Sequence, residues 1–338
     1  MKSTITDVAR RAGVSMKTVS RVMNNEPSVS KATREKVKSA ARELDYTPNL
    51  AARRLASSKS YLIAMLYDIP SPGYVINIQK GATTACREFG YHLVVEPLET
   101  MESNVMADIE TLLGHLRVDG VILAPPLCDN GEVVSLLARR NIPYIPIAPS
   151  TQHGDVQIVK MDDVRAAREM TEYLIRLGHT DIGFVKGHPR HSASALRFQG
   201  FREAMRKANL RINPDWIEEG LFTYKCGVEA AGKILSQSKK PSAIFACNDD
   251  MAAGIIASAM GLGLKVPEDL SVCGFDDSPL ADSVWPRLTT IRQPVREMGY
   301  MAASLLLGRQ APQKNKAEQL VFSLDHALIE RESTRSKS

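Results

Sequence analysis

Apolar positions near the start of the chain recur at helical spacing in two short segments separated by a turn. In the first segment Val8, Ala9 and Ala12 fall on one face, and Thr6 precedes them as a candidate N-cap. Gly13 follows at a point where a helix ends in a left-handed residue. The pattern therefore predicts a short amphipathic helix that stops at Gly13.

The second segment is amphipathic in the same way, with Ser15 as its candidate N-cap. Its apolar face is formed by Val19, Val22 and Met23. Met16 and Lys17 then stand at the exposed start of the helix, and Arg21 follows one turn later with a second long donor. Such donors suit guanine acceptors and phosphates in a major groove. We therefore predict a DNA-binding helix-turn-helix; the alternative is an ordinary helical hairpin.

A third helix begins after Ser30, its candidate N-cap, and runs to Leu44. It completes a helical headpiece over residues 1–48. Asn49 then offers a cap for a short segment ending near residue 56, within a hinge or linker over 49–60. A helix this short is marginal in water. The hinge is thus either a plain linker or a helix that forms only on DNA beside a partner hinge.

Charge separates this region from the rest of the chain. Residues 1–59 hold 13 Lys or Arg and 5 Asp or Glu, a net charge of +8, whereas the remaining residues carry a net charge of −3. A basic module joined to a nearly neutral body is the electrostatic footprint of phosphate binding. The charge distribution favours the DNA-binding interpretation.

After the hinge, short apolar runs alternate with helical patterns, which predicts an α/β core of two doubly wound parallel sheets. For the first lobe we expect strands at 61–66, 91–95, 119–123 and 142–147 and helices near 74–89, 103–116 and 131–140. For the second we expect strands at 182–185, 216–218, 243–247 and 270–275 and helices near 163–177, 197–208, 226–236 and 249–260. Ligands of such sheets bind at the carboxyl ends of the strands, which here face a cleft between the lobes.

The expected core spans residues 61–332. Its first lobe comprises about 61–159 plus 293–320, its second about 160–292 plus 321–332, and a tail over 333–338 follows a closing strand at 324–331. No coiled-coil heptads extend the chain, which favours a dimer over a tetramer.

Cysteine usage and hydropathy predict a cytoplasmic protein. The five cysteines are odd in number and widely spaced, so we expect buried reduced thiols rather than disulfides or a metal site. No apolar run approaches the roughly 18 residues of a membrane span, and the polar start lacks the apolar region of a signal peptide. His188 and His191 lie on a proline-containing loop without a third ligand, so no metal and no cofactor is expected.

Several motifs in order along the chain resemble one family. They are Thr6–Ala9, Val14–Val22, Thr33–Val37, Leu44–Asn49, the hinge, Leu177–His179, Asn248–Asp249, Val272–Asp277 and Leu288–Ile291. Through them the chain resembles the lactose-repressor (LacI/GalR-type) family of bacterial transcription regulators over essentially its whole length. The resemblance implies a homodimer on a pseudo-palindromic double-stranded operator. It also implies a small effector held between lobes like those of periplasmic sugar-binding proteins.

The resemblance assigns the DNA contacts position by position. Met16, Lys17 and Arg21 are the candidates for reading bases. The candidate phosphate contacts are Thr4, Ser15, Thr18, Ser20, Asn24 and Ser30. Leu55, with Ala52 beside it, is the candidate wedge in the minor groove, where an apolar side chain kinks a base step; the alternative for Leu55 is packing within the hinge.

The resemblance likewise gives the candidate effector contacts: Asp68, Tyr74, Arg197, Phe222, Asn248, Asp276 and Gln293. Carboxylate and amide groups at strand ends suit vicinal hydroxyls, and the fork of an arginine binds two oxygens. Each residue also has a structural alternative. These are loop packing for Asp68 and Tyr74, a surface salt bridge for Arg197, core packing for Phe222, a helix cap for Asn248 and a turn for Asp276.

Effector chemistry is constrained by one departure from the family. Where purine-binding members carry a tryptophan after the fourth strand of the first lobe, this chain has Ile147, Ala148 and Pro149. A flat base would lose a stacking partner there, which favours a carbohydrate as the effector. A hydroxy acid and a phosphorylated sugar are the alternatives that the sequence does not exclude. The chain is thus predicted to be a carbohydrate-responsive repressor, the alternative being a regulator corepressed by a non-sugar metabolite.

An enzyme and a sugar-binding protein without a DNA role are the rival classes. Doubly wound lobes also carry dehydrogenases and kinases, so the fold alone does not decide function. No glycine-rich dinucleotide loop follows the first strand, and no phosphate-binding loop or nucleophile-elbow motif occurs. The basic headpiece disfavours the sugar-binding module. We therefore expect a non-enzyme.

Overall fold

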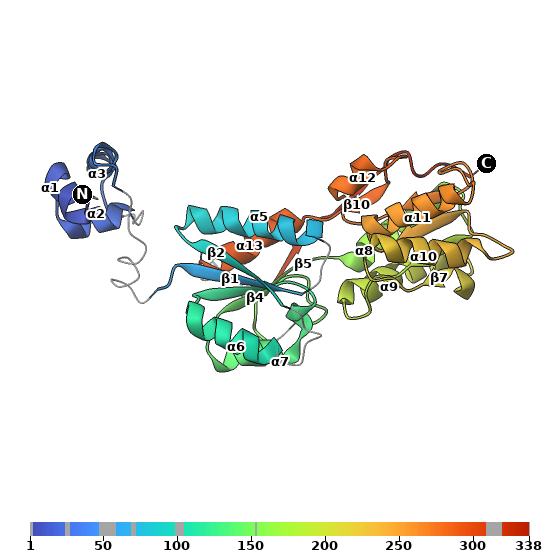
Figure 1. Ribbon diagram of the computed structural model, residues 1–338, viewed down its shortest axis with the longest axis horizontal. Helices are drawn as coiled ribbons and strands as arrows, with labels where there is room; N and C mark the ends of the chain where they lie inside the picture. Colours follow the sequence, from blue (N-terminus) through green and yellow to red (C-terminus); the bar gives the residue numbers. More distant parts are fainter. Residues whose placement is uncertain are drawn as a thin grey trace. The chain divides into compact units, whose positions relative to one another are not determined.

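The computed structural model describes residues 3–23, 28–46, 59–68, 72–98, 105–152, 154–308 and 320–337. The chain divides into two compact units, residues 1–61 and residues 62–338. The first is the helical headpiece and the second is the α/β core (Figure 1). The predicted fold class is confirmed.

The headpiece consists of α1 (Ile5–Ala12), α2 (Met16–Met23) and α3 (Lys31–Glu43). Its small core contains Val8, Val19 and Val37, one from each helix and each fully buried. Gly13 has φ of 66° and ends α1 in the left-handed conformation, as predicted. The apolar patterns of all three helices therefore converge on one core.

The start of α1 differs from the prediction. Thr4, not Thr6, is the N-cap: its side chain accepts a hydrogen bond from the Asp7 backbone amide, and the Asp7 carboxylate accepts one from the Thr4 amide at 3.0 Å. This reciprocal pair is a capping box, which satisfies two backbone donors at once. Thr6 lies inside the first turn because the helix begins at Ile5.

The first lobe contains a parallel sheet of order β2-β1-β3-β4, formed by β1 (Leu62–Tyr67), β2 (His92–Pro97), β3 (Gly120–Leu123) and β4 (Tyr144–Pro146). Figure 1 shows α5 (Pro72–Glu88) and α13 (Val295–Leu306) over one face of the sheet and α6 (Val105–Leu116) and α7 (Gly131–Arg139) over the other. A short 3-10 helix, Leu127–Asp129, follows β3. The helix α13 belongs to this lobe although it comes late in the chain.

The second lobe repeats the plan with a parallel sheet of order β7-β6-β8-β9. Its strands are β6 (Ile182–Val185), β7 (Ile217–Glu218), β8 (Ala243–Ala246) and β9 (Ser271–Cys273). Its helices are α8 (Asp163–Arg176), α9 (Ser192–Lys207), α10 (Tyr224–Leu235), α11 (Asp249–Gly261) and the short α12 (Pro279–Ser283), with a 3-10 turn at Pro214–Trp216.

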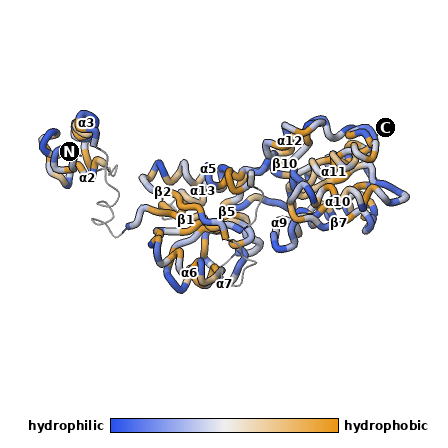
Figure 2. Tube along the Cα trace, viewed as in Figure 1, coloured by the Kyte–Doolittle hydropathy of each residue, from blue (hydrophilic) through white to orange (hydrophobic). Residues whose placement is uncertain are grey.

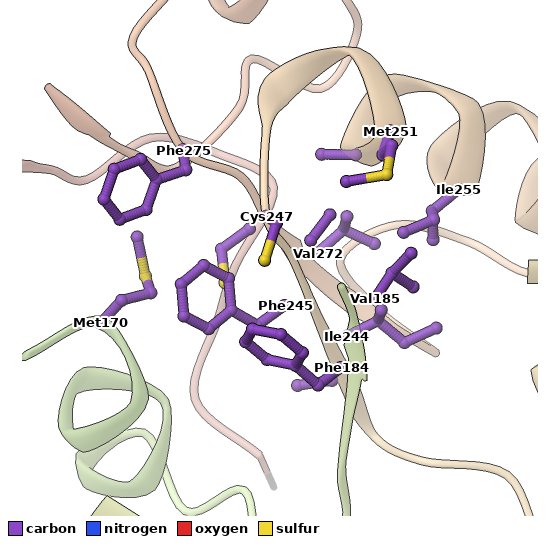
Figure 3. Packing of buried hydrophobic residues seen from close by; sticks show 14 of the residues in the cluster. Met170, Phe184, Val185, Ile244, Phe245, Cys247, Met251, Ile255, Val272 and Phe275 are labelled. Atoms are coloured by element: carbon purple, nitrogen blue, oxygen red, sulfur yellow. The ribbon is translucent and has the colours of Figure 1, made fainter. Parts of the chain in front are cut away.

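The core of the second lobe lies on both faces of this sheet. Figure 3 shows Phe184 and Phe245 on the side of Met170, which comes from α8, whereas Val185 and Ile244 lie toward Met251 of α11. Neighbouring residues of one strand therefore pack into opposite layers, as strand geometry requires. Both faces are apolar, which explains the continuous apolar runs in the sequence.

The lobes are joined by short strands. β5 (Ile158–Met161) pairs in parallel with β11 (Val321–Leu324), and β10 (Thr290–Arg292) pairs antiparallel with β12 (Ala327–Ile329). The closing strand expected over 324–331 contains β12 and only the last residue of β11, because the two strands are separate and pair with different partners. The chain segments that contain these four strands therefore connect the two lobes.

Residues 333–337 pack on the second lobe, although their polar sequence suggested a separate tail. Ser333 is fully buried, where its hydroxyl donates to the Val272 carbonyl at 2.6 Å and accepts from the Thr289 amide at 2.8 Å. The Lys337 amide donates to the Leu177 carbonyl at 2.7 Å. Polar groups hold this segment, so an apolar pattern could not reveal it.

Hydropathy follows this architecture: in Figure 2 hydrophobic residues gather along the strands, and hydrophilic residues mark the outer turns. The five cysteines are free thiols, as predicted; Cys226 is half-buried and the other four are buried. In the described part of the chain, no helix has both the length and the apolar character needed to cross a membrane.

Candidate DNA-reading helix and inter-lobe cavity

The second helix of the headpiece has one buried and one exposed side. Val19 and Val22 are buried, whereas Lys17 and Arg21 are exposed and 54% of the Met16 surface is accessible. The three candidate base-reading residues are therefore on the side of α2 that faces away from the core. A helix that packs through one face and presents long donors on the other has the form required for a major groove.

The candidate phosphate contacts include the hydroxyls that begin the three helices. The backbone amide of Asp7 donates to Thr4 Oγ1 at 3.4 Å, that of Thr18 to Ser15 Oγ at 3.1 Å, and that of Thr33 to Ser30 Oγ at 3.3 Å. Exposed helix starts carry partial positive charge, which suits phosphate oxygens. Thr18 and Ser20 are half-buried on α2. Asn24, Ala52 and Leu55 lie outside the described residues.

A cavity opens at the carboxyl ends of the strands within the core, which we call the inter-lobe cavity. Its empty volume is about 490 Å³, part of it open to solvent. The first lobe contributes Tyr74, Pro125 and Ala148. The second lobe and the segments between the lobes contribute Asp163, His191, Ala193, Arg197, Phe222, Asn248, Asp276 and Gln293. Six of the seven predicted effector residues therefore line one cavity.

Arg197 is the buried cation of this cavity. Its Nε donates to Asp163 Oδ1 at 2.8 Å, and its Nη1 donates to the Cys247 carbonyl at 2.6 Å. Its guanidinium lies 3.6 Å from the centroid of the Phe275 ring. Because only 4% of Arg197 is exposed, the surface salt bridge considered for it is excluded. Its contacts fix the orientation of the guanidinium at the edge of the cavity.

Asp276 follows β9 and faces Arg197. Its Oδ1 accepts from Gln293 Nε2 at 2.5 Å and lies 3.9 Å from Arg197 Nη1. Burial raises the pKa of Asp276 to about 7, although the Arg197 charge opposes the shift. Its φ of 117° is unusual for a residue with a side chain, and this strain is of the kind held at functional sites. The carboxylate is thus positioned as an acceptor.

Phe222 forms an aromatic wall next to His191. The two rings meet edge to face with centroids 5.4 Å apart. Gly187 makes room for the phenyl ring, because a Cβ on Gly187 would lie 2.0 Å from it. Burial lowers the pKa of His191 to about 4, so the imidazole is neutral at pH 7. Tyr74 supplies a further ring from α5, and burial raises its pKa.

Asn248 lines the cavity and also holds local structure. Its Oδ1 accepts from the Met251 amide at 3.0 Å and so caps α11, while its Nδ2 donates to the Phe222 carbonyl at 2.9 Å. The helix-cap alternative is therefore correct for its oxygen. Through its nitrogen the same side chain fixes the backbone of the aromatic wall.

Asp68 is the predicted effector residue that does not line the cavity. It is fully buried at the end of β1, and its Oδ2 lies 3.5 Å from Arg190 Nη2 of the second lobe. Its carboxylate is therefore placed to join the lobes, and its contact with an effector stays a prediction. Strand position alone could not distinguish these roles, because Arg190 comes from a loop distant in sequence.

Five cavity residues were not among the predicted effector contacts: Pro125, Ala148, Asp163, His191 and Ala193. Asp163 begins α8 directly after the N-cap Asp162, whose side chain accepts a hydrogen bond from the Arg165 amide. The two adjacent acidic residues at the expected start of this helix are a signal that the sequence offered. Ala193 was missed because α9 begins at Ser192, five residues before the expected start. Ala148 belongs to the stretch from Ile147 to Pro149 that follows the fourth strand, where no aromatic residue stands.

Comparison with known families matches the two parts of the chain separately. Residues 4–49 match the model described as bacterial regulatory proteins, lacI family. Residues 171–334 match a periplasmic binding protein-like domain. These ranges contain α1 to α3 and most of the second lobe.

Whole-length relatives extend the match. The HTH-type transcriptional repressor PurR of Vibrio cholerae serotype O1 (strain M66-2) is 35% identical, covering 98% of each chain. The HTH-type transcriptional regulator DegA of Bacillus subtilis (strain 168) is 36% identical, covering 99% of this chain and 98% of its own.

Solved structures agree with the sequence relatives. The lac repressor dimer bound to operator and the anti-inducer ONPF has a TM-score of 0.78 and 29% identity, covering 99% of this chain and all of that chain. A complex of the transcriptional regulator CelR with cellobiose has a TM-score of 0.74 and 30% identity, covering 98% and 99%. The chain therefore belongs to the lacI family of bacterial DNA-binding transcriptional regulators.

Proposed function

We propose that the protein is a transcriptional repressor that binds a pseudo-palindromic operator as a homodimer. One recognition helix covers only half of such a site, so two-fold operator symmetry implies two-fold protein symmetry. A small effector in the inter-lobe cavity controls the affinity for DNA. The observation that carries this proposal is a cavity lined by charged and aromatic side chains in the same chain as a helix-turn-helix with its reading side exposed.

The proposed effector is a carbohydrate. Asp276 and Arg197 offer an acceptor and a donor side by side, with Asp276 Oδ1 3.9 Å from Arg197 Nη1, an arrangement suited to vicinal hydroxyls. Phe222 supplies an apolar wall for a sugar face. Ala148 also lines the cavity and supplies no ring for stacking a base. The similarity to the CelR complex with cellobiose supports the same class.

A planar base that acts as corepressor is the second candidate. Tyr74 and Phe222 come from different lobes and both line the cavity, so two rings are available for a flat ligand. The relative PurR is named a repressor and is 35% identical. The two candidate effectors have opposite effects on operator affinity, because a sugar inducer lowers it whereas a corepressor raises it.

Operator titrations with and without effector test the proposal. An operator is first selected from random DNA, and neutral sugars and nucleobases are then screened for a change in affinity. Arg197→Ala should bind the operator like the wild type and lose the response, because Arg197 lines the cavity of the α/β core whereas α2 belongs to the other unit. Arg206→Ala, an exposed arginine on the same helix, is the matched control and should respond normally. An Arg197→Ala protein with a wild-type response contradicts the assignment.

A further inference from the structure

The charged side chains that line the inter-lobe cavity are few in the described residues. They are Asp163, Arg197 and Asp276. When both carboxylates are ionised, the wall of the cavity carries one more negative than positive charge. Asp250 adds a further nearby carboxylate, because its charge also raises the pKa of Asp276.

The single cation of this wall already has its own counterions. Arg197 Nε donates to Asp163 at 2.8 Å, and its Nη1 donates to a backbone carbonyl and lies 3.9 Å from Asp276. One face of the planar guanidinium is covered by the Phe275 ring, whose centroid lies 3.6 Å from Arg197 Cζ. An anionic ligand would therefore have to compete with two protein carboxylates for Arg197.

The partial positive charges of the helix starts near the cavity do not offset the excess of negative charge in its wall. α8 has Asp163 in its first turn, and α11 has Asp249 and Asp250. α9 begins beside the cavity without an acidic residue in its first turn, and a helix start contributes roughly half a positive charge. When Asp276 is ionised, that half charge is smaller than the excess of one carboxylate.

Cations beyond the wall are neutralised in the same way. Arg190 lies 3.5 Å from the buried Asp68. The pKa values of His191 and His188 are both lowered, first by burial, so neither imidazole supplies positive charge at pH 7. The described surroundings of the cavity therefore offer no uncompensated cation to a phosphate or a carboxylate.

We propose that the effector is an uncharged molecule, neither phosphorylated nor carboxylated, whose hydroxyl or N–H groups donate to Asp276. The inference rests on the proposed function of the cavity and narrows its ligand. It excludes phosphorylated sugars and hydroxy acids, which the sequence had left open. An uncharged donor satisfies the carboxylate, whereas an anion placed beside Asp276 meets a like charge in a poorly solvated site.

The proposal fixes the sign of a pH effect. Asp276 is faced by Arg197 from α9, Gln293 after β10, Asp163 from α8, Asp249 and Asp250 from α11, and Tyr74 from α5. A neutral donor favours the ionised carboxylate, lowers its pKa on binding and releases a proton. Its affinity therefore rises with pH through the region near 7, by up to about tenfold per pH unit. An anion would take up a proton and bind more weakly as pH rises.

Inorganic phosphate and acetate test the exclusion of anions without knowledge of the effector. Thermal melting of the full chain is measured with each anion against chloride at equal ionic strength. Arg197→Gln removes the cation, and Ala193→Phe fills the cavity without changing charge, which keeps the test valid if Arg197→Gln folds poorly. We expect no anion-specific stabilisation that these variants abolish; a shift retained by both arises outside the cavity. Stabilisation of the wild type that Ala193→Phe abolishes overturns the proposal.

A panel of matched probes then tests the positive claim: glucose with glucose 6-phosphate and gluconate, and adenine with adenosine monophosphate. A stabiliser lost in Ala193→Phe should be uncharged and should bind more tightly at pH 8 than at pH 6. A charged stabiliser with the opposite pH dependence contradicts the inference while leaving the effector role of the cavity intact. Stabilisers that act equally on Ala193→Phe would instead contradict the proposed function of the cavity.

Discussion

Phe222 shows how a single glycine shapes the inter-lobe cavity. The ring stands where Gly187 has no side chain, and the Phe222 carbonyl accepts from Asn248 at 2.9 Å. The residue has φ of 62°, so its backbone is held in a conformation that few side chains adopt. The aromatic wall therefore depends on Gly187 and Asn248 as much as on Phe222 itself.

Gly187→Ala should displace the Phe222 ring, because the new Cβ would lie 2.0 Å from it. We expect at least a tenfold loss of effector affinity, equivalent to about 1.4 kcal/mol, with operator affinity unchanged. Gly232→Ala on α10 is the matched control: nothing lies within 4 Å of its Cβ, and alanine should stabilise the helix by about 1 kcal/mol. Titration of both variants with effector measures the two affinities. An unchanged affinity in Gly187→Ala would show that the Phe222 ring does not contact the effector.

Among the helices, the predicted starts differ from the structure more than the predicted ends do. The apolar faces of α1 and α2 are where the pattern put them, because they must converge on one core. The start of α1 moved from Thr6 to Thr4 because the Asp7 carboxylate completes a capping box. A hydroxyl two residues away has no such partner, and apolar spacing does not distinguish the two.

Thr4→Ala should therefore destabilise the headpiece by about 1 kcal/mol, the usual effect of losing an N-cap. Thr6→Ala should change its stability by less than half of that, because Thr6 is exposed and does not cap α1. Thermal or urea unfolding followed by a probe in the headpiece distinguishes the two variants. Equal destabilisation by both substitutions would argue against the capping box.

Strands and site residues could be predicted where a local apolar pattern marks them, and not where they depend on contacts distant in sequence. β6 and β8 were found because four consecutive buried apolar residues leave a clear pattern. β5, β10, β11 and β12 have at most four residues each and none is buried along its whole length, so pattern alone did not isolate them. Asp276 and Asn248 follow such apolar strands, so the sequence could place them at the cavity. The role of Asp68 depends instead on its long-range contact with Arg190.

At the scale of the whole core, the ion pair between Asp68 and Arg190 links the two lobes near the cavity. Asp68 is fully buried, and Arg190 Nη2 lies 3.5 Å from its carboxylate. A contact across the lobes favours the arrangement in which both lobes line the cavity. Effectors act only through unequal affinity for two arrangements, so this pair should influence the response.

Arg190→Gln should weaken the closed arrangement and lower effector affinity by no more than about tenfold, because 39% of the Arg190 side chain is exposed and solvent screens the pair. Arg202→Gln, an exposed arginine on α9, is the control and should bind effector normally. Calorimetric titration of both variants measures the difference. Equal affinities for Arg190→Gln and the wild type would show that the ion pair plays no part in closure.

Selection from random duplex DNA tests whether α2 reads a symmetric operator for a dimer. We expect enrichment of an inverted repeat with half-sites about one helical turn apart. Lys17→Ala or Arg21→Ala should relax preference at particular base pairs by about 1–3 kcal/mol, whereas Thr18→Ala should weaken all sequences similarly. Absence of an enriched repeat for the wild type, or unchanged preference in both the Lys17 and the Arg21 variants, would show that α2 does not read the operator in this way.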